Sequence, residues 1–255
     1  MQLDHMTWNE VEAWLKQGVS IMLPLGSTEQ HGPMGLIGTD TICAARIAHA
    51  AAEICGGLVA PALAYTPAPF NTAFPGTVSI SEILFHDLLL QICKSFLEQG
   101  FQGVFLVNGH GANLATANAV ASSLAPGSVT VQSWWDPAPV TALRQSMFGA
   151  WEGMHATPSE VSITQVFYGR KPAGAAADPP VKLTPAYIAA HSGDRHGPPL
   201  QHRAHFPDGR VGSHSALSSP EQGSALLQAA AKALAQNFDA FSAERRHMSG
   251  DATAL

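Results

Sequence analysis

The chain has 255 residues, of which 46% are hydrophobic and 13% are charged, with 13 Lys and Arg against 19 Asp and Glu. The apolar fraction excludes general disorder, and the net charge of −6 disfavours nucleic acid as a partner. Charged residues reach only half of the usual ~25%, so we expect a homo-oligomer that covers part of its own surface. The 12 His indicate site chemistry, because histidine titrates near neutrality and is the commonest metal ligand.

The N-terminus and the cysteines predict a cytoplasmic protein. Residues 1–6 have neither the basic nor the apolar region of a signal peptide. No run of about 18 uncharged apolar residues exists, so no membrane segment is expected. Cys43, Cys55 and Cys93 lie in apolar helical stretches, which is typical of core thiols in a reducing compartment. No CxxC pair is present, which excludes a structural zinc finger.

Strands alternate with helices through the first half of the chain. Thr7 and Glu10 form a capping box before a helix that reaches about Lys16. The continuous apolar run at 20–25 is typical of a strand buried on both faces of a sheet. The pattern then predicts a helix over 40–54, a strand over 58–63, a helix over 79–100, a strand over 104–107, a helix to about 124 and a strand over 129–134.

The second half departs from this alternation. A helix is expected from Thr157 to about Tyr168, and another from Ser219 to about Arg245, followed by a tail that frays. Between them, residues 170–217 are rich in Gly, Pro and His and too long for an ordinary connection, so we interpret them as a functional loop or an interface arm. The alternation predicts an α/β fold over residues 1–255, a single domain with a mainly parallel central sheet flanked by helices.

Polar clusters follow two of the predicted strands. One contains Glu29 and His31, and the other contains His110. Because ligands bind outside the carboxyl ends of the strands in an open α/β sheet, both clusters are expected at one sheet edge. Glu29 and His31 are two residues apart in extended chain and so point the same way. Asp40 begins the next helix, close enough to fold back towards them.

Two histidines and two carboxylates at one sheet edge indicate a metal site. Nitrogen and oxygen ligands without sulfur suit Zn²⁺ or Mn²⁺, and a bridging carboxylate would allow two ions, as in many hydrolases. Each residue alone has an ordinary explanation: Glu29 as a solvated loop acid, either histidine as a turn residue bonded to backbone, and Asp40 as a helix N-cap. Their joint position after two buried strands favours the metal site.

A third cluster precedes the helix at Thr157 and contains Trp151, His155 and Glu160. Thr157 and Glu160 form a capping box, which explains Glu160 without any metal. His155 is equally compatible with an ordinary loop residue, and Trp151 with either a core residue or a substrate wall. The residues alone leave both interpretations of this cluster open.

Several other classes of site lack their motifs. The Gly109-x-Gly111 pair is too short for a dinucleotide fingerprint, and no acidic residue follows at the ribose position. The chain contains no G-x-S-x-G nucleophile elbow and no Walker A sequence. A Rossmann-like nucleotide binder and a serine hydrolase are therefore disfavoured.

Three stretches together resemble the creatininase (creatinine amidohydrolase) family. They are residues 23–33 with 38–40, residues 108–113, and residue 155 with 160–162, and weaker matches lie at 74–79 and 212–223. The resemblance runs over most of the chain, and its first motif is highly specific. It implies an α/β fold with a central parallel sheet, a binuclear metal amidohydrolase and a hexameric assembly.

The resemblance also implies five metal ligands and two divalent ions, with Zn or Mn expected and Fe as a further candidate. Asp40 would bridge the two ions. Glu29 and His110 would complete the ligands of one ion, and His31 and Glu160 those of the other.

Two further roles follow from the same resemblance. His155 matches the acid/base histidine of the family, which passes a proton to the leaving nitrogen. Trp151 matches a tryptophan on the substrate side of the site.

This chain departs from creatininases proper at several positions. They have a carboxylate two residues after the histidine of the second motif, where this chain has Ala112, so it resembles the broader branch that takes this ligand from Glu160. Other departures are expected to face substrate and argue against creatinine itself; they lie at Met34, Phe70-Asn71, Met154 and Thr157-Pro158.

The expected function is therefore a metal-dependent amidohydrolase that cleaves a non-peptide or cyclic C–N amide bond of a small molecule through a metal-activated water. The alternative is a non-catalytic family member that binds metal or ligand and has lost its substrate machinery. Met154 and Phe70-Asn71 favour this alternative, because they replace residues usual in the family.

Overall fold

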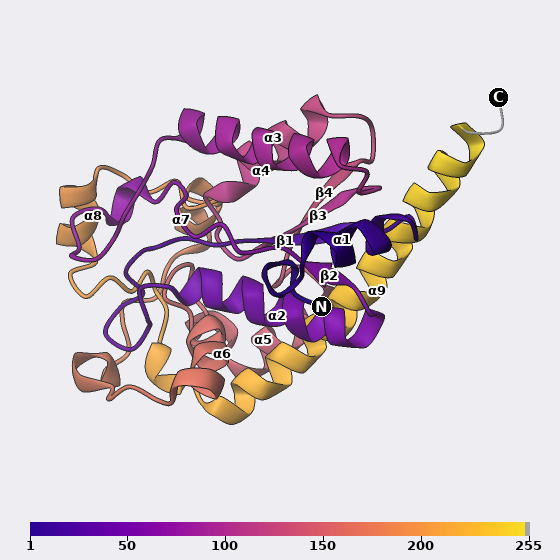
Figure 1. The fold of residues 1–255 in the computed structure, drawn as a ribbon. Coiled ribbons are helices and arrows are strands. Elements are labelled where there is room, and N and C mark those ends of the chain that lie inside the picture. Colours follow the sequence, from indigo (N-terminus) through magenta and orange to yellow (C-terminus); the bar gives the residue numbers. More distant parts are fainter. Residues whose placement is uncertain (253–255) are drawn as a thin grey trace.

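The computed structural model describes residues 1–252. They form a four-stranded parallel sheet with helices packed around it (Figure 1). The strands are β1 (Ile21–Leu25), β2 (Leu58–Val59), β3 (Val104–Asn108) and β4 (Val129–Ser133), in the order β2-β1-β3-β4. β1 and β3 pair over their full length, from Ile21 opposite Val104 to Leu25 opposite Asn108. The predicted α/β fold with a parallel central sheet is confirmed.

Helices cover both faces of this sheet (Figure 1). One face packs against α2 (Thr39–Cys55), α5 (Ala138–Met147), α6 (Pro158–Tyr168) and α9 (Pro220–Ala252). The other face packs against α1 (Trp8–Leu15), α3 (Glu82–Glu98) and α4 (Asn113–Ser123). Successive strand residues enter opposite cores, as Met22 and Leu23 do, because side chains alternate along a strand. Burial on both faces explains why the strand sequences are continuously apolar.

The strand order reverses between β1 and β3, which is where a crevice forms in an open α/β sheet. α2 crosses one face after β1, whereas α3 and α4 cross the other face after β2 and β3. Two glycines stand directly behind the strand ends. A Cβ on Gly26 would overlap the backbone of Thr41, and one on Gly109 would overlap the carbonyl of Asp40. These glycines let the start of α2 approach the crevice and place Asp40 at its edge.

Residues 170–217 contain short helices rather than a featureless loop. They include α7 (Pro185–Ala190) and α8 (Pro199–His205), with single 3₁₀ turns at Gly174–Ala177 and Ser215–Leu217. Residues 188 and 192–194 line the same cavity as Asp40, so part of this segment reaches the crevice. Its assignment as a functional loop or interface arm remains a prediction.

Three elements differ from expectation. β2 ends at Val59, because Pro61 cannot donate a ladder hydrogen bond, and only an isolated bridge joins Leu63 to Leu25. α5 was not predicted, and just one of its residues, Val140, is fully buried. α9 continues beyond Arg245 to Ala252, so the expected fraying is wrong up to that point; residues 253–255 lie outside the described part.

Within residues 1–252, no helix combines the length and the apolar character that crossing a membrane requires. Cys43, Cys55 and Cys93 are free thiols. Cys43 and Cys93 are buried as expected, whereas Cys55 is only partly buried.

The contact between α6 and α9 depends on Gly223. A Cβ there would overlap the backbone of Ser162. Alanine in a helix is normally favoured over glycine, but here we expect Gly223→Ala to lower the free energy of unfolding by about 1–3 kcal/mol through overpacking. Denaturant unfolding measures this change. The exposed Gln228→Ala in the same helix is the control, and a Gly223→Ala protein as stable as the control would contradict the close approach.

Candidate metal centre

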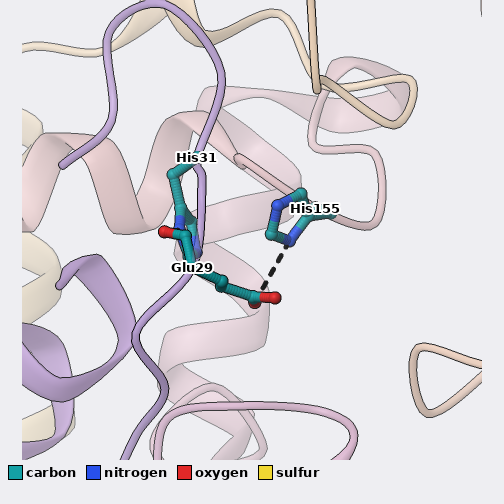
Figure 2. A group of neighbouring side chains, drawn as sticks. All are labelled: Glu29, His31 and His155. Atoms are coloured by element: carbon teal, nitrogen blue, oxygen red, sulfur yellow. Dashed lines mark hydrogen bonds and ion pairs between the residues drawn. The ribbon is translucent and has the colours of Figure 1, made fainter. Parts of the chain in front are cut away.

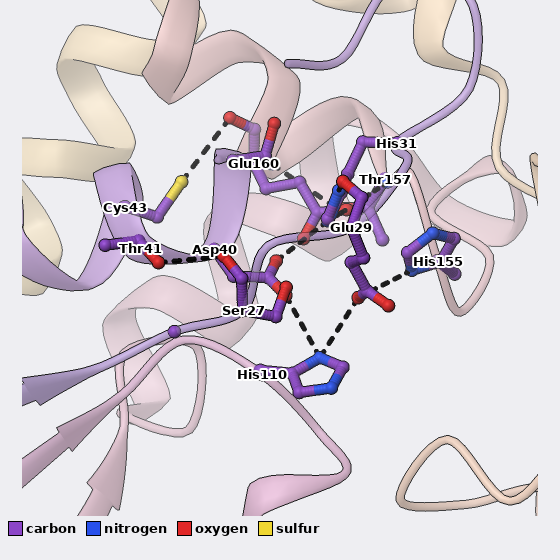
Figure 3. Close-up of polar contacts among 12 residues, drawn as sticks. Ser27, Glu29, His31, Asp40, Thr41, Cys43, His110, His155, Thr157 and Glu160 are labelled. Carbon is purple, nitrogen blue, oxygen red and sulfur yellow. Dashed lines mark hydrogen bonds and ion pairs between the residues drawn. The ribbon is translucent and has the colours of Figure 1, made fainter. Parts of the chain in front are cut away.

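All five side chains predicted as metal ligands meet at the crevice (Figure 3). All five are buried, with exposed fractions of 0% for Glu29, 1% for His31, 3% for Asp40, 2% for His110 and 8% for Glu160. The loops after β1 and β3 supply three of them, and the first turns of α2 and α6 supply the two others. Elements far apart in sequence thus converge as the strand-end argument predicted.

Asp40 lies at the centre of this cluster, with one oxygen towards each histidine. Its Oδ1 is 2.8 Å from His31 Nε2, and its Oδ2 is 3.0 Å from His110 Nδ1. Ser27 Oγ also donates a hydrogen bond of 2.7 Å to Oδ2. A carboxylate with its two oxygens divided in this way is suited to bridge two cations.

Backbone carbonyls determine which nitrogen of each histidine faces Asp40. His31 Nδ1 lies 3.1 Å from the carbonyl oxygen of Glu29, and His110 Nε2 lies 2.8 Å from that of Pro67. Because a carbonyl can only accept, these nitrogens carry hydrogen, and in the neutral ring the other nitrogen presents a lone pair. A lone pair 2.8–3.0 Å from a carboxylate oxygen is repulsive unless a proton or a metal ion lies between the two atoms.

The residues therefore fit a metal centre. Ligand atoms bound to one ion at ~2.0–2.2 Å are about 3–3.5 Å apart, and most contacts to Asp40 and Glu29 here are close to that spacing. Glu29 Oε1 is buried without a hydrogen bond from any described residue and lies 3.1 Å from His110 Nδ1. Two groups that could hold an ion match the expected ligand sets: Glu29, Asp40 and His110, and His31, Asp40 and Glu160.

A third group was not predicted from the sequence. Glu29, His31 and His155 also lie close enough to share an ion (Figure 2). His155 Nδ1 is 3.7 Å from Glu29 Oε1, and its ring centroid is 4.5 Å from that of His31. The imidazole of His155 therefore stands against the metal centre, either as a proton carrier or as a further ligand.

The electrostatics of the metal-free cluster show the same demand for positive charge. Burial lowers the pKa of His31, but Asp40, Glu160 and Glu29 outweigh it and raise the pKa to about 10. Burial also opposes the charged form of His110, yet Glu29 and Asp40 raise its pKa well above the ordinary value. Protons thus occupy these positions when no metal does.

Glu160 is both a helix cap and a member of the cluster. Its carboxylate accepts a hydrogen bond from the backbone N–H of Thr157, and its own N–H donates to Thr157 Oγ1 over 3.3 Å, which completes the capping box. Its Oε1 also lies 3.9 Å from His31 Nε2. Burial raises the pKa of Glu160 to about 8. The two interpretations left open by the sequence are therefore compatible.

His155 is held from behind by main chain and by Asn71. Its Nε2 lies 2.7 Å from the carbonyl oxygen of Gln30, to which it donates, and burial lowers its pKa. Asn71 Nδ2 donates to Glu29 Oε2 over 2.9 Å and lies 3.1 Å from His155 Nε2. Because His155 Nε2 and Asn71 Nδ2 both carry hydrogen, their approach is a packing contact. The fully buried Asn71 thus positions Glu29, a predicted ligand, and packs against the predicted proton carrier.

A cavity of about 340 Å³ opens onto the cluster. Asp40, His110, His155 and Glu160 contribute to its lining, and its other walls include Trp134, Trp135, Asp136, Arg144, Met154, Thr157, Ile188 and Asp194. This volume lies in the range of small-molecule sites.

Trp151 is not among the residues that line this cavity. Its ring lies 4.3 Å from Lys182 Nζ and makes an edge contact with His214. Met34, expected to face substrate, instead packs in a small core with Val161 and Ala176. Phe70 is likewise buried, whereas Met154 and Thr157 do face the cavity.

The sequence analysis did not identify Ser27 and Asp194 as residues of the site, and it named Asn71 only as a position expected to face substrate. Ser27 and Asn71 contact predicted ligands, and a polar residue close in sequence to Glu29 was an available signal for Ser27. Asp194 lies in the aperiodic segment, where no pattern indicated it.

Comparison with known proteins gives a family model and several relatives. The Creatininase model, described as creatinine amidohydrolase, matches residues 4–238. Creatinine amidohydrolase of Pseudomonas putida is 28% identical over 182 residues, which are 64% of this chain and 70% of that protein. A 3-dehydro-scyllo-inosose hydrolase of Thermotoga maritima is 35% identical over 116 residues, 45% of this chain and 37% of that one.

A mycofactocin precursor peptide peptidase of Mycolicibacterium smegmatis is 42% identical over 108 residues, which cover 40% of this chain and 43% of the peptidase. The match therefore spans less than half the length of two of these three relatives. Among solved structures, a manganese form of creatininase superposes with a TM-score of 0.70 at 23% identity, covering 92% of this chain and 96% of that one. A Zn–Zn form of a creatininase mutant superposes with a TM-score of 0.68. These superpositions show a shared fold.

Metal binding should release protons from the cluster. With the pKa of His31 raised to about 10 and that of Glu160 to about 8, both groups are protonated in the metal-free protein at pH 7. We expect Zn²⁺ to displace more than one proton per chain at pH 7, and fewer as the pH rises through 8 towards 10. Titration calorimetry in buffers of different ionisation enthalpy counts these protons. Zinc binding at pH 7 without proton release would contradict the protonated cluster.

Proposed function

The chain belongs to the creatininase family, as its motifs predicted, and on that basis we propose that it is a metal-dependent amidohydrolase. The proposed reaction cleaves a non-peptide or cyclic C–N amide bond of a small molecule with an activated water. The relatives of the chain are named for three different activities, so it belongs to the family in its broad sense rather than to creatininase proper.

The central observation in support is the pair of histidine lone pairs that face the two oxygens of Asp40. His31 and His110 approach these oxygens at 2.8 and 3.0 Å, a spacing that calls for a cation on each side. We propose that Glu29 and His110 complete one ion's ligands and that His31 and Glu160 complete those of the other. Zn²⁺ and Mn²⁺ suit these nitrogen and oxygen donors, and iron is a further candidate.

Divalent ions in such a site supply a Lewis acid and lower the pKa of water towards neutrality. The chain's own contribution to proton transfer is His155. Burial holds its pKa below the ordinary value, so its ring starts neutral and can take up a proton and pass it to the leaving nitrogen. The hydrogen bond from Nε2 to Gln30 leaves Nδ1 on the side of Glu29, where a proton would be exchanged.

The cavity supports a small substrate. Trp134 and Trp135 offer flat apolar walls, while Arg144 and Asp136 add polar groups. Trp151, proposed from the family as a substrate-side residue, lies under Lys182 and outside the lining of this cavity.

Three broader proposals accompany this function. We propose one domain over residues 1–255 in which segment 170–217 serves the site or an interface, and a homo-oligomer, hexameric by family resemblance, supported by the low charged fraction of 13%. The buried free thiols of Cys43 and Cys93 support a cytoplasmic setting.

The binuclear proposal predicts that Asp40→Ala loses both ions, because both would share this carboxylate. Elemental analysis of protein purified without chelator should give about two ions per wild-type chain and almost none in the variant. The exposed Asp178→Ala is the matched control and should keep both. One ion per wild-type chain, or full metal occupancy in Asp40→Ala, would contradict the binuclear proposal.

His155 should be required for turnover but not for metal. We expect His155→Ala to retain both ions and to lower kcat by about 10²–10⁴-fold, the usual contribution of a general acid–base group. The assay is a panel of cyclic amides, formamides and short peptides, with metal content measured on the same samples. If the variant loses an ion, His155 belongs to the third ligand group instead. His86→Ala, a partly exposed histidine away from the cluster, provides the control.

A non-catalytic, metal-binding role is the second candidate, favoured by one observation. Phe70 and Asn71 replace the Glu-His usual in the family, and the ring of Phe70 packs edge-on against His155. Two bound ions without turnover on the whole panel would support this candidate over the hydrolase.

A further inference from the structure

We propose that Asp194 is a latch that holds the α7–α8 segment over the cavity, and that loading of the metal centre tightens this hold. The inference rests on the proposed metal centre but concerns a residue outside its five ligands. The tightening in this proposal comes from the charge of the bound ions acting on the carboxylate of Asp194.

The carboxylate of Asp194 reaches the metal centre from the aperiodic segment. Its Oδ2 lies 3.7 Å from His110 Nδ1, the nitrogen that faces Asp40, and its Oδ1 lies 3.8 Å from His196 Nε2. The side chain is only 10% exposed. Asp194 belongs to none of the three groups that could hold an ion, so it stands beside the centre, on the cavity side.

Two backbone features show that this position is specifically accommodated. Asp194 adopts a φ of 56°, in the left-handed region that costs energy for residues other than glycine, although Asp and Asn tolerate it best. On the opposite wall, a Cβ on Gly111 would overlap the carboxylate of Asp194, and all three of its nearest neighbours would be Asp194 atoms. Gly111 thus leaves a hollow, beside His110, that the Asp194 carboxylate fills.

Charge makes this contact stronger when metal is bound. Asp194 already lies beside His110 in the structure. Two divalent ions would bring four positive charges to a centre with three ligand carboxylates and leave one positive charge in excess, which attracts Asp194 in a site of low dielectric constant. Loading therefore tightens the hold on the latch.

The rest of the segment can move together with the latch. Tyr187 and His191 stack with ring centroids 3.8 Å apart, and His196 lies 5.5 Å from His191 and 5.0 Å from His202. These rings tie α7 and α8 to the turn that carries Asp194. A firmly held Asp194 would thus also keep Ile188, on α7, against the cavity that it lines.

Hydrogen exchange tests the latch without any substrate. The amides of His191, Arg195 and His196 form hydrogen bonds within the segment, so their exchange reports its opening. We expect Zn²⁺ to slow this exchange about tenfold in the wild type, the effect of one charge-assisted contact on local opening. Asp194→Asn keeps the size and the left-handed preference but not the charge, and should lose the slowing. Exposed Asp178→Asn in the same segment should keep it.

Gly111→Ala provides an independent variant, because its methyl group would push the carboxylate out of its hollow and should also abolish the zinc-dependent slowing. Metal content is measured on every sample, so that failure of the proposed metal centre can be distinguished from failure of the latch. A wild type that binds no zinc would overturn the proposed metal centre. Two bound zinc ions with unchanged exchange, or with equal slowing in Asp194→Asn, would overturn the latch alone.

Discussion

The structure depends on one unmet electrostatic requirement, the need for positive charge on both sides of Asp40. Each oxygen of this buried carboxylate faces an imidazole nitrogen at hydrogen-bond distance, and the other nitrogen of each ring donates its N–H to a backbone carbonyl. The fold is arranged to make this contact. The strand order reverses at β1 and β3, and glycines behind both strand ends let α2 bring Asp40 to the crevice.

Most of the surrounding polar structure supports this arrangement rather than adding ligands. Ser27 donates to Asp40, and Asn71 donates to Glu29 while contacting His155. Such partners fix the orientation and the tautomer of the groups that would meet an ion, and their loss commonly costs affinity or activity. The three relatives described above are hydrolases named for different substrates.

The sequence predicted those parts of the site that local rules govern. Glu29, His31, Asp40 and His110 follow buried strands or begin a helix, and the carboxyl ends of parallel strands necessarily meet at one edge. Glu160 was ambiguous because a capping box and a ligand use the same residue types. The position of Trp151 depends on Lys182 and His214, which are distant in sequence, and Asp194 lies in a segment without periodicity. Such long-range contacts leave no local pattern. The family resemblance, by contrast, named Glu160 as an expected ligand, and its carboxylate lies in the cluster.

The shared use of Glu160 has a consequence for how the centre would be filled. Its carboxylate already holds the first turn of α6 through Thr157, and it faces His31 from that fixed position. A ligand anchored in this way loses little rotamer freedom when a cation arrives, so the entropic cost of coordination is met during folding rather than during uptake. The first turn of α6 would therefore act as a rigid support for the Glu160 carboxylate. It would favour ions whose radius matches the existing distance between Glu160 and His31, and it would disfavour ions that need this turn to unwind.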